Sequence, residues 1–89
     1  MVGEILLVFQ DQTLKDPRGL AIDDRGYIYI AANMSSNVML LCSNGQQCQQ
    51  LLSKDNGTRN PRALYYDIPQ NRLFVATKEG KVHIFEVSE

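Results

Sequence analysis

Residues 16–23 read Asp-Pro-Arg-Gly-Leu-Ala-Ile-Asp, and residues 60–67 return to this pattern as Asn-Pro-Arg-Ala-Leu-Tyr-Tyr-Asp, 44 residues further on. One period shared by several separate segments indicates a structural repeat rather than coincidence. The chain of 89 residues therefore divides into two repeat units, residues 1–44 and residues 45–89. The other recurring segments, at offsets of 44 or 45, are 7–11 with 51–55, 27–31 with 72–76, and 37–41 with 81–85.

Each unit is predicted to form four short strands. Turn-forming residues such as Asn44-Gly45 and Glu79-Gly80 separate the apolar runs, and no run has the spacing of a helix. Named by their place in a blade, the strands follow one another as D-A-B-C and again D-A-B-C. We expect strand D at 4–10 and 47–53, strand A at 19–23 and 63–67, strand B at 27–32 and 72–77, and strand C at 37–42 and 81–86.

Strand B is apolar on both faces, which decides between the all-β architectures. In the first unit Ile28 and Ile30 face one way while Tyr29 and Ala31 face the other. An antiparallel strand with one wet face alternates apolar with polar residues, so this strand must be covered on both sides. Blades stacked around an axis provide that cover, and the prediction is two four-stranded antiparallel blades of a β-propeller. The equivalent residues in the second unit are Leu73 and Val75 on one face and Phe74 and Ala76 on the other.

Two blades cannot close a ring, because propellers have about four to eight. We therefore expect an incomplete ring whose remaining blades come from a longer parent protein or from self-association of several chains. A fragment of a longer protein is the preferred interpretation.

Composition excludes several classes. The chain is 44% hydrophobic with a net charge of −1, unlike a disordered chain or a strongly basic nucleic-acid binder. The longest early apolar run, residues 5–9, is short for a signal peptide, so we expect a cytoplasmic protein with no DNA or membrane partner. Hairpin registers at Asn44-Gly45 place Cys42 and Cys48 poorly for a disulfide, so both are predicted to be free thiols.

The motif residues closely resemble the NHL repeat. They are Pro17 to Asp23, then Gly26 to Ala31, then Asn37-Val38. The first unit departs from the family at Asn33, where Asp is usual, and the second at Lys78 to Lys81, where Asp and Asn-x-Arg are usual. The resemblance covers nearly the whole chain.

That resemblance implies a non-catalytic binding platform. The implied role is the partner-recruiting propeller segment of a tripartite-motif (TRIM) ubiquitin ligase, whose ligase activity would belong only to a longer parent protein. The expected partner is a protein. The alternatives are an RNA-binding NHL propeller and a fragment of a propeller hydrolase or lyase.

Four residues are predicted to contact a ligand: Arg18, Arg62, Tyr65 and Lys78. The two arginines follow proline at the same repeat position and suit phosphate or carboxylate, unless they pair with a nearby acid such as Asp16. One tyrosine of the pair Tyr65-Tyr66, with Tyr65 as the candidate, would line the central channel and offer an aromatic contact, and the alternative is a packing role. A basic stripe for RNA requires the fold to gather six residues: Lys54, Arg59, Arg62, Arg72, Lys78 and Lys81.

No catalytic, metal or cofactor residue is predicted. His83, the only histidine, has no Cys, Asp or Glu at ligand spacing. Asp23 and Asp67 are interpreted as caps of the turn after strand A. The sequons at Asn33 and Asn56 matter only in a secreted chain.

Overall fold

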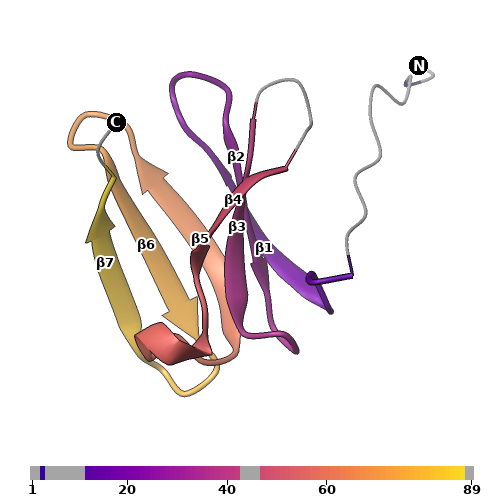
Figure 1. The fold of residues 1–89 in the computed structure, drawn as a ribbon. Helices are drawn as coiled ribbons and strands as arrows, with labels where there is room; N and C mark the ends of the chain where they lie inside the picture. The colour runs from indigo at the N-terminus through magenta and orange to yellow at the C-terminus, as the bar shows by residue number, and fades with distance from the viewer. Residues whose placement is uncertain (1–2, 4–11, 43–46, 88–89) are drawn as a thin grey trace.

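The computed structural model describes Gly3, residues 12–42 and residues 47–87, with the side chains of residues 47 and 48 excepted. The chain folds into two antiparallel sheets, so the predicted all-β class is confirmed (Figure 1). The first sheet has the order β1-β2-β3-β4 and the second β5-β6-β7. The strands are β1 Pro17–Ile22, β2 Ile28–Ala32, β3 Asn37–Leu41, β4 Gln47–Leu52, β5 Pro61–Asp67, β6 Arg72–Thr77 and β7 Val82–Glu86, with the 3-10 helix η1 Lys54–Asn56 between β4 and β5.

The boundary between the two sheets does not coincide with the boundary between the two repeat units of the sequence. Strand β4 belongs to the second unit in sequence but pairs with β3, so it completes the first sheet. The second sheet has three strands rather than the predicted four, and the strand predicted at 4–10 lies outside the described residues.

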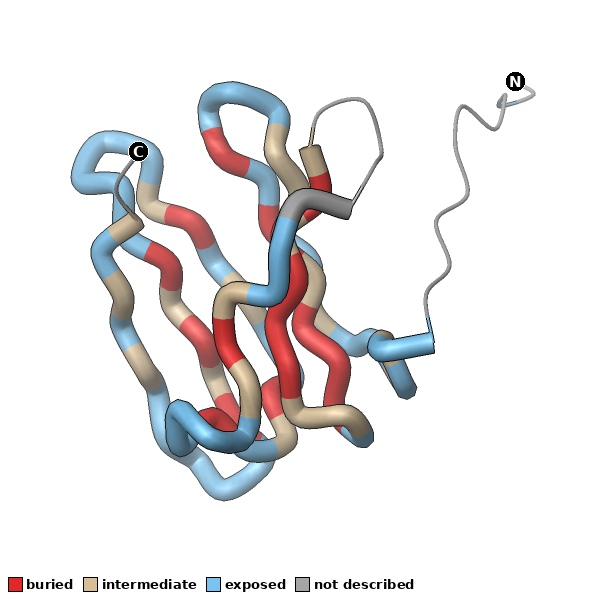
Figure 2. Tube along the Cα trace, in the orientation of Figure 1, coloured by how far each residue is buried: buried red, intermediate tan, exposed pale blue. Residues whose placement is uncertain are grey.

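The two sheets stack face to face, most closely where β1 lies beside β5 (Figure 1). A Cβ added to Gly19 would lie 3.0 Å from the Ala63 Cα, so glycine permits this approach of the two backbones. Figure 2 shows the buried residues concentrated where the sheets face each other. The buried core consists of Ala21, Tyr29, Ala31, Val38 and Leu52 from the first sheet and Tyr66, Leu73 and Val75 from the second.

The core combines one face of the repeat unit, from the first sheet, with the opposite face of the repeat unit, from the second sheet. The first sheet contributes the face of Tyr29 and Ala31, and the second contributes the face of Leu73 and Val75. By the repeat, these second-sheet residues correspond to Ile28 and Ile30, which lie on the other face of β2. Sheets that follow one another around an axis stack in this way, which confirms the prediction drawn from the doubly apolar strand B.

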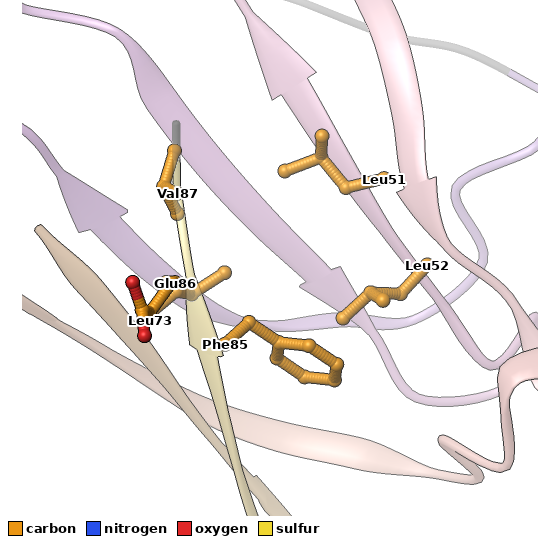
Figure 3. Close-up of a pocket in the computed structure, with 6 residues that line it drawn as sticks. All are labelled: Leu51, Leu52, Leu73, Phe85, Glu86 and Val87. Atoms are coloured by element: carbon orange, nitrogen blue, oxygen red, sulfur yellow. The ribbon is translucent and has the colours of Figure 1, made fainter. Parts of the chain in front are cut away.

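The sheets separate toward their outer strands. A cavity of about 240 Å³ lies there, bordered by Leu51 and Leu52 of β4 and by Phe85 and Val87 at the end of β7 (Figure 3). The wedge-shaped gap is expected of blades that are closest near the axis and diverge outward.

The prediction of free thiols is wrong, because Cys42 is disulfide-bonded. The strands pair Leu41 with Gln47 and Leu40 with Gln49, so Cys48 is the extra residue of a β-bulge. A bulge shifts side chains relative to the regular alternation, and neither hairpin register considered from the sequence contained one. Disulfides persist in oxidising compartments, so the cysteines no longer support the cytoplasmic prediction. The described residues contain no helix with the length and apolarity needed to cross a membrane.

Candidate functional site

One rim of the molecule collects the chain's basic residues. Strands β1, β3, β5 and β7 begin at this rim, and β2, β4 and β6 end there, because neighbouring strands are antiparallel. All nine basic residues are described, and seven of them lie in the segments at this rim, which we call the basic rim. They are Lys15, Arg18, Lys54, Arg59, Arg62, Lys78 and Lys81.

Acidic residues dominate the opposite rim. Among the described residues, three acids accompany the seven basic residues at the basic rim, namely Asp16, Asp55 and Glu79. The other rim has four acids, Asp23, Asp24, Asp67 and Glu86, and two basic residues, Arg25 and Arg72. The fold therefore separates charge along the strand direction in a chain whose net charge is −1. Such separation produces a local positive potential that attracts anionic partners.

The fold brings together five of the six residues of the predicted stripe. Lys54, Arg59, Arg62, Lys78 and Lys81 share the basic rim, and Arg72 stands at the opposite rim because β6 begins there. A polar hollow of about 490 Å³ also opens on the basic rim, between Lys15 and Lys54.

Arg18 pairs with the acid that precedes it. Its Nε donates to both carboxylate oxygens of Asp16, at 3.2 and 3.1 Å. This pairing with Asp16 is the alternative to ligand binding that the sequence indicates. The Asn33 side-chain amide donates to the same carboxylate at 3.1 Å. This hydrogen bond, followed by Arg18 and then the nearby Arg62, lowers the pKa of Asp16 although burial opposes the shift. Arg18 is therefore partly neutralised before any ligand arrives.

Arg62 and Lys78 are different from Arg18. Both are exposed, and neither side chain forms a hydrogen bond or ion pair with the residues that the structure describes. The backbone N–H of Lys78 donates to the Asn60 carbonyl at 3.0 Å, which holds Lys78 close to the start of β5. Lys15, Lys54, Arg59 and Lys81 are likewise exposed and unpaired in the described part of the chain, so six of the seven cations of the basic rim can bind an external anion.

Asn60 connects the start of β5 to the turn between β2 and β3 at the basic rim. Its side-chain amide donates to the Asn33 carbonyl at 3.1 Å, and its backbone N–H donates to the Ser36 hydroxyl at 3.0 Å. Asn60 and its repeat equivalent Asp16 both have positive φ, at 51° and 59°, a conformation that Asn and Asp tolerate better than most residues. Sequence reasoning missed Asn33 and Asn60, although an Asx residue before proline in both units was a signal for this turn.

An unsatisfied acceptor lies beside this network. The Oδ1 atom of Asn33 is buried and has no hydrogen-bond partner among the described residues, and Asn33 is only 8% exposed. Buried amide oxygens are normally paired, so this atom is available to a donor group.

The fourth predicted contact, Tyr65, lies away from the rim. It occupies the middle of β5 on the outward face of the second sheet, where it is 65% exposed and contacts Phe74 edge-on. Its neighbour Tyr66 is buried, with its ring stacked on Tyr29 at 5.3 Å between centroids. The structure thus brings together Arg18, Arg62 and Lys78 and leaves Tyr65 apart.

Other titratable side chains, such as those of Asp23 and His83, interact with neighbouring residues of the fold. The Asp23 carboxylate accepts from the backbone N–H groups of Arg25 and Tyr27 at 2.9 and 3.0 Å, which confirms that it caps the turn between β1 and β2. His83 stacks on Phe85, and its buried Nε2 has no partner in the described part of the chain. Within the described ranges, no three His, Cys, Asp or Glu side chains gather as a metal site would require.

Stacked antiparallel sheets that approach along β1 and β5 and diverge outward have the architecture of neighbouring β-propeller blades. The comparison with solved structures agrees. The chain is similar to the crystal structure of selenomethionine-substituted virginiamycin B lyase from Staphylococcus aureus, a β-propeller, with a TM-score of 0.51 and 15% sequence identity. The match covers 89% of this chain and 29% of that chain. At this identity the likeness establishes the fold and no activity.

The chain spans less than a third of the propeller it matches. No protein-family model matches the sequence, and no curated protein is similar to it. The fold is therefore propeller-like, and these comparisons assign the chain to no particular propeller family.

Proposed function

We propose that this chain is a non-catalytic binding segment of an NHL-type propeller that recruits a protein partner through its basic rim. The observation that supports this proposal is the gathering of seven basic residues at one rim, of which only Arg18 forms a side-chain hydrogen bond or ion pair with the described residues. A surface of this kind favours a partner with an acidic segment, because complementary charge speeds encounter and fixes orientation. In a TRIM-type ligase, the recruited protein would be the substrate.

The test compares two charge reversals of the same residue type. Arg62→Glu removes a free cation from the basic rim and adds a repulsive charge, whereas Arg72→Glu makes the same change at the opposite rim. Both arginines are exposed, so both variants are expected to fold. Proteins captured from the source cell by the whole propeller are quantified for wild type and both variants.

A partner of the basic rim is expected to be lost with Arg62→Glu and kept with Arg72→Glu. Its affinity should fall by at least about tenfold, the effect of losing one charge-assisted hydrogen bond. If the same partners bind all three proteins equally, the basic rim does not recruit them and the proposal is wrong.

RNA is the second candidate partner, since the same rim favours a phosphate backbone. Binding that rests on phosphate contacts weakens with salt, by a slope of roughly 0.7 per neutralised phosphate for single strands. Short single-stranded RNA is titrated into the propeller at about 50 and about 200 mM salt. Binding at low salt that Arg62→Glu weakens and Arg72→Glu spares would support RNA, and absence of binding at low salt would remove it.

A further inference from the structure

The outward faces of both sheets carry exposed apolar side chains. On the first sheet Leu20 and Ile22 are 61% and 53% exposed, and on the second Tyr65, Val82 and Ile84 are 65%, 59% and 56% exposed. These are five of the seven exposed large apolar residues in the described part of the chain. Soluble proteins seldom leave contiguous apolar surface open to water, so these faces are expected to bind something.

The outward face of the second sheet is equivalent to a face that is already buried. The repeat relates each apolar residue on it to a residue with which the first sheet packs against the second. The corresponding pairs are Tyr65 with Ala21, Phe74 with Tyr29, Ala76 with Ala31, Val82 with Val38, and Ile84 with Leu40.

The converse holds for the outward face of the first sheet. Its apolar residues correspond to those with which the second sheet packs against the first. The pairs here are Leu20 with Leu64, Ile22 with Tyr66, Ile28 with Leu73, and Ile30 with Val75. The internal stack therefore joins two unlike faces, and each of these faces recurs on the far side of the other sheet. The recurring face of the second sheet is exposed. That of the first sheet is exposed along β1 at Leu20 and Ile22 and is buried in β3 at Met39 and Leu41.

We propose that a second copy of this chain docks head to tail on the first. The outward face of its first sheet would cover Tyr65, Val82 and Ile84, and so repeat the stacking that β1 and β5 make inside one chain. This arrangement continues an interface that the structure already contains, and each copy leaves one face for the next. It does not depend on what the basic rim binds.

The extent of the match with the lyase sets the size of the assembly. Since 89% of this chain corresponds to 29% of that propeller chain, about three copies would fill a ring of that size. Two copies or more are therefore expected in solution, and three where the ring closes.

The docking predicts a complementation that distinguishes it from other modes of association. Ile22→Lys disables the outward face of the first sheet, and Ile84→Lys disables that of the second. Each variant alone has only one kind of working face and is expected to be monomeric by light scattering. An equimolar mixture is expected to form a dimer, because the intact face of one variant meets the complementary intact face of the other.

Two further exposed apolar residues provide matched controls. Met34 and Ile68 are 72% and 46% exposed but lie in turns, so Met34→Lys and Ile68→Lys should associate as wild type does. Circular dichroism checks that each variant keeps its strands, and formation of the mixed dimer itself shows that both partners are folded. A wild-type monomer at every concentration, or a mixture that stays monomeric, would overturn the proposal and leave these faces to another occupant.

Discussion

The hydroxyl of Tyr29 donates to the buried carboxylate of Asp23 at 2.9 Å, and this bond connects the start of β2 to the turn that precedes it. The tyrosine is fully buried, and the same carboxylate caps the turn through two backbone N–H groups. One residue pair thus connects the core between the sheets to the geometry of the first hairpin.

Tyr29→Phe is expected to destabilise the chain by about 1–3 kcal/mol, because it leaves a buried carboxylate oxygen with one donor fewer. Urea unfolding at neutral pH measures the free energy of unfolding. Tyr65→Phe makes the same chemical change at an exposed position and is the control, with an expected effect within about 0.5 kcal/mol. Equal effects of the two substitutions would show that the Tyr29 hydroxyl contributes nothing specific.

Alkaline pH is expected to destabilise the fold through the same tyrosine. Burial, and then the hydrogen bond to Asp23, raise the pKa of Tyr29 above its usual value, and burial also raises the pKa of Tyr66. A group with a raised folded-state pKa contributes stability that is complete below the unfolded value, near 10, and is lost as pH rises past it. The free energy of unfolding should therefore be level up to about pH 9.5 and fall above about pH 10, less steeply in Tyr29→Phe. An equal decline in wild type and variant would contradict the role of Tyr29.

The sequence predicted the stacked sheets but not the charge separation. The 44-residue repeat and the doubly apolar strand B were sufficient for the first, because both depend on side-chain alternation along a strand. The predicted basic stripe groups residues by their order in the sequence, whereas the fold sorts charge by strand ends, which alternate between the rims within each unit. Arg72 was grouped with Lys78 for this reason, although a strand separates them.

Local irregularities account for the remaining differences. The bulge that contains Cys48 changes the alternation on which the free-thiol prediction depended. The network of Asn33 and Asn60 relies on positive φ and on contacts between segments far apart in sequence, which periodicity does not encode.

Gly19→Ala is expected to separate the sheets where they are closest. The added Cβ would lie 3.0 Å from the Ala63 Cα and 3.1 Å from the Leu64 backbone nitrogen, and backbone atoms cannot turn aside as a flexible side chain can. Overpacking of this kind costs about 1–3 kcal/mol, measurable by thermal or urea unfolding. Gly3→Ala is the control because its added Cβ would meet nothing within 4 Å. A Gly19→Ala variant as stable as wild type would show that the space between β1 and β5 accommodates the added methyl group.

Asn33→Asp is expected to reverse the effect that acid has on stability through Asp16. In the wild type the amide of Asn33 is the main cause of the lowered pKa of Asp16, so the contribution of Asp16 is present above its unfolded pKa and is lost as pH falls through the lower folded value. The substitution removes a donor and sets a second carboxylate beside the first, which raises the pKa of one of them.

The variant should be destabilised at neutral pH and recover part of its stability as the pH falls below about 5, when one carboxyl binds a proton. Carboxyl resonances followed by NMR report the pKa of Asp16 directly. Asn56→Asp places the same charge at an exposed site and should leave that pKa unchanged. An unchanged pKa of Asp16 in Asn33→Asp would show that the hydrogen bond between them is not what lowers it.

Reduction is expected to weaken the outer hairpin of the first sheet, because Cys42 at the end of β3 is disulfide-bonded. The only other cysteine in the sequence is Cys48, and a bond that closes so short a loop contributes about 2 kcal/mol to stability. Dithiothreitol should lower the melting temperature of the wild type and have no effect on Cys42→Ser, which should already melt at the lower temperature. Thiol labelling in denaturant without reductant should label no cysteine in the oxidised protein. If both thiols react, the bond does not form in the purified protein, and the compartment in which this chain works must be judged without it.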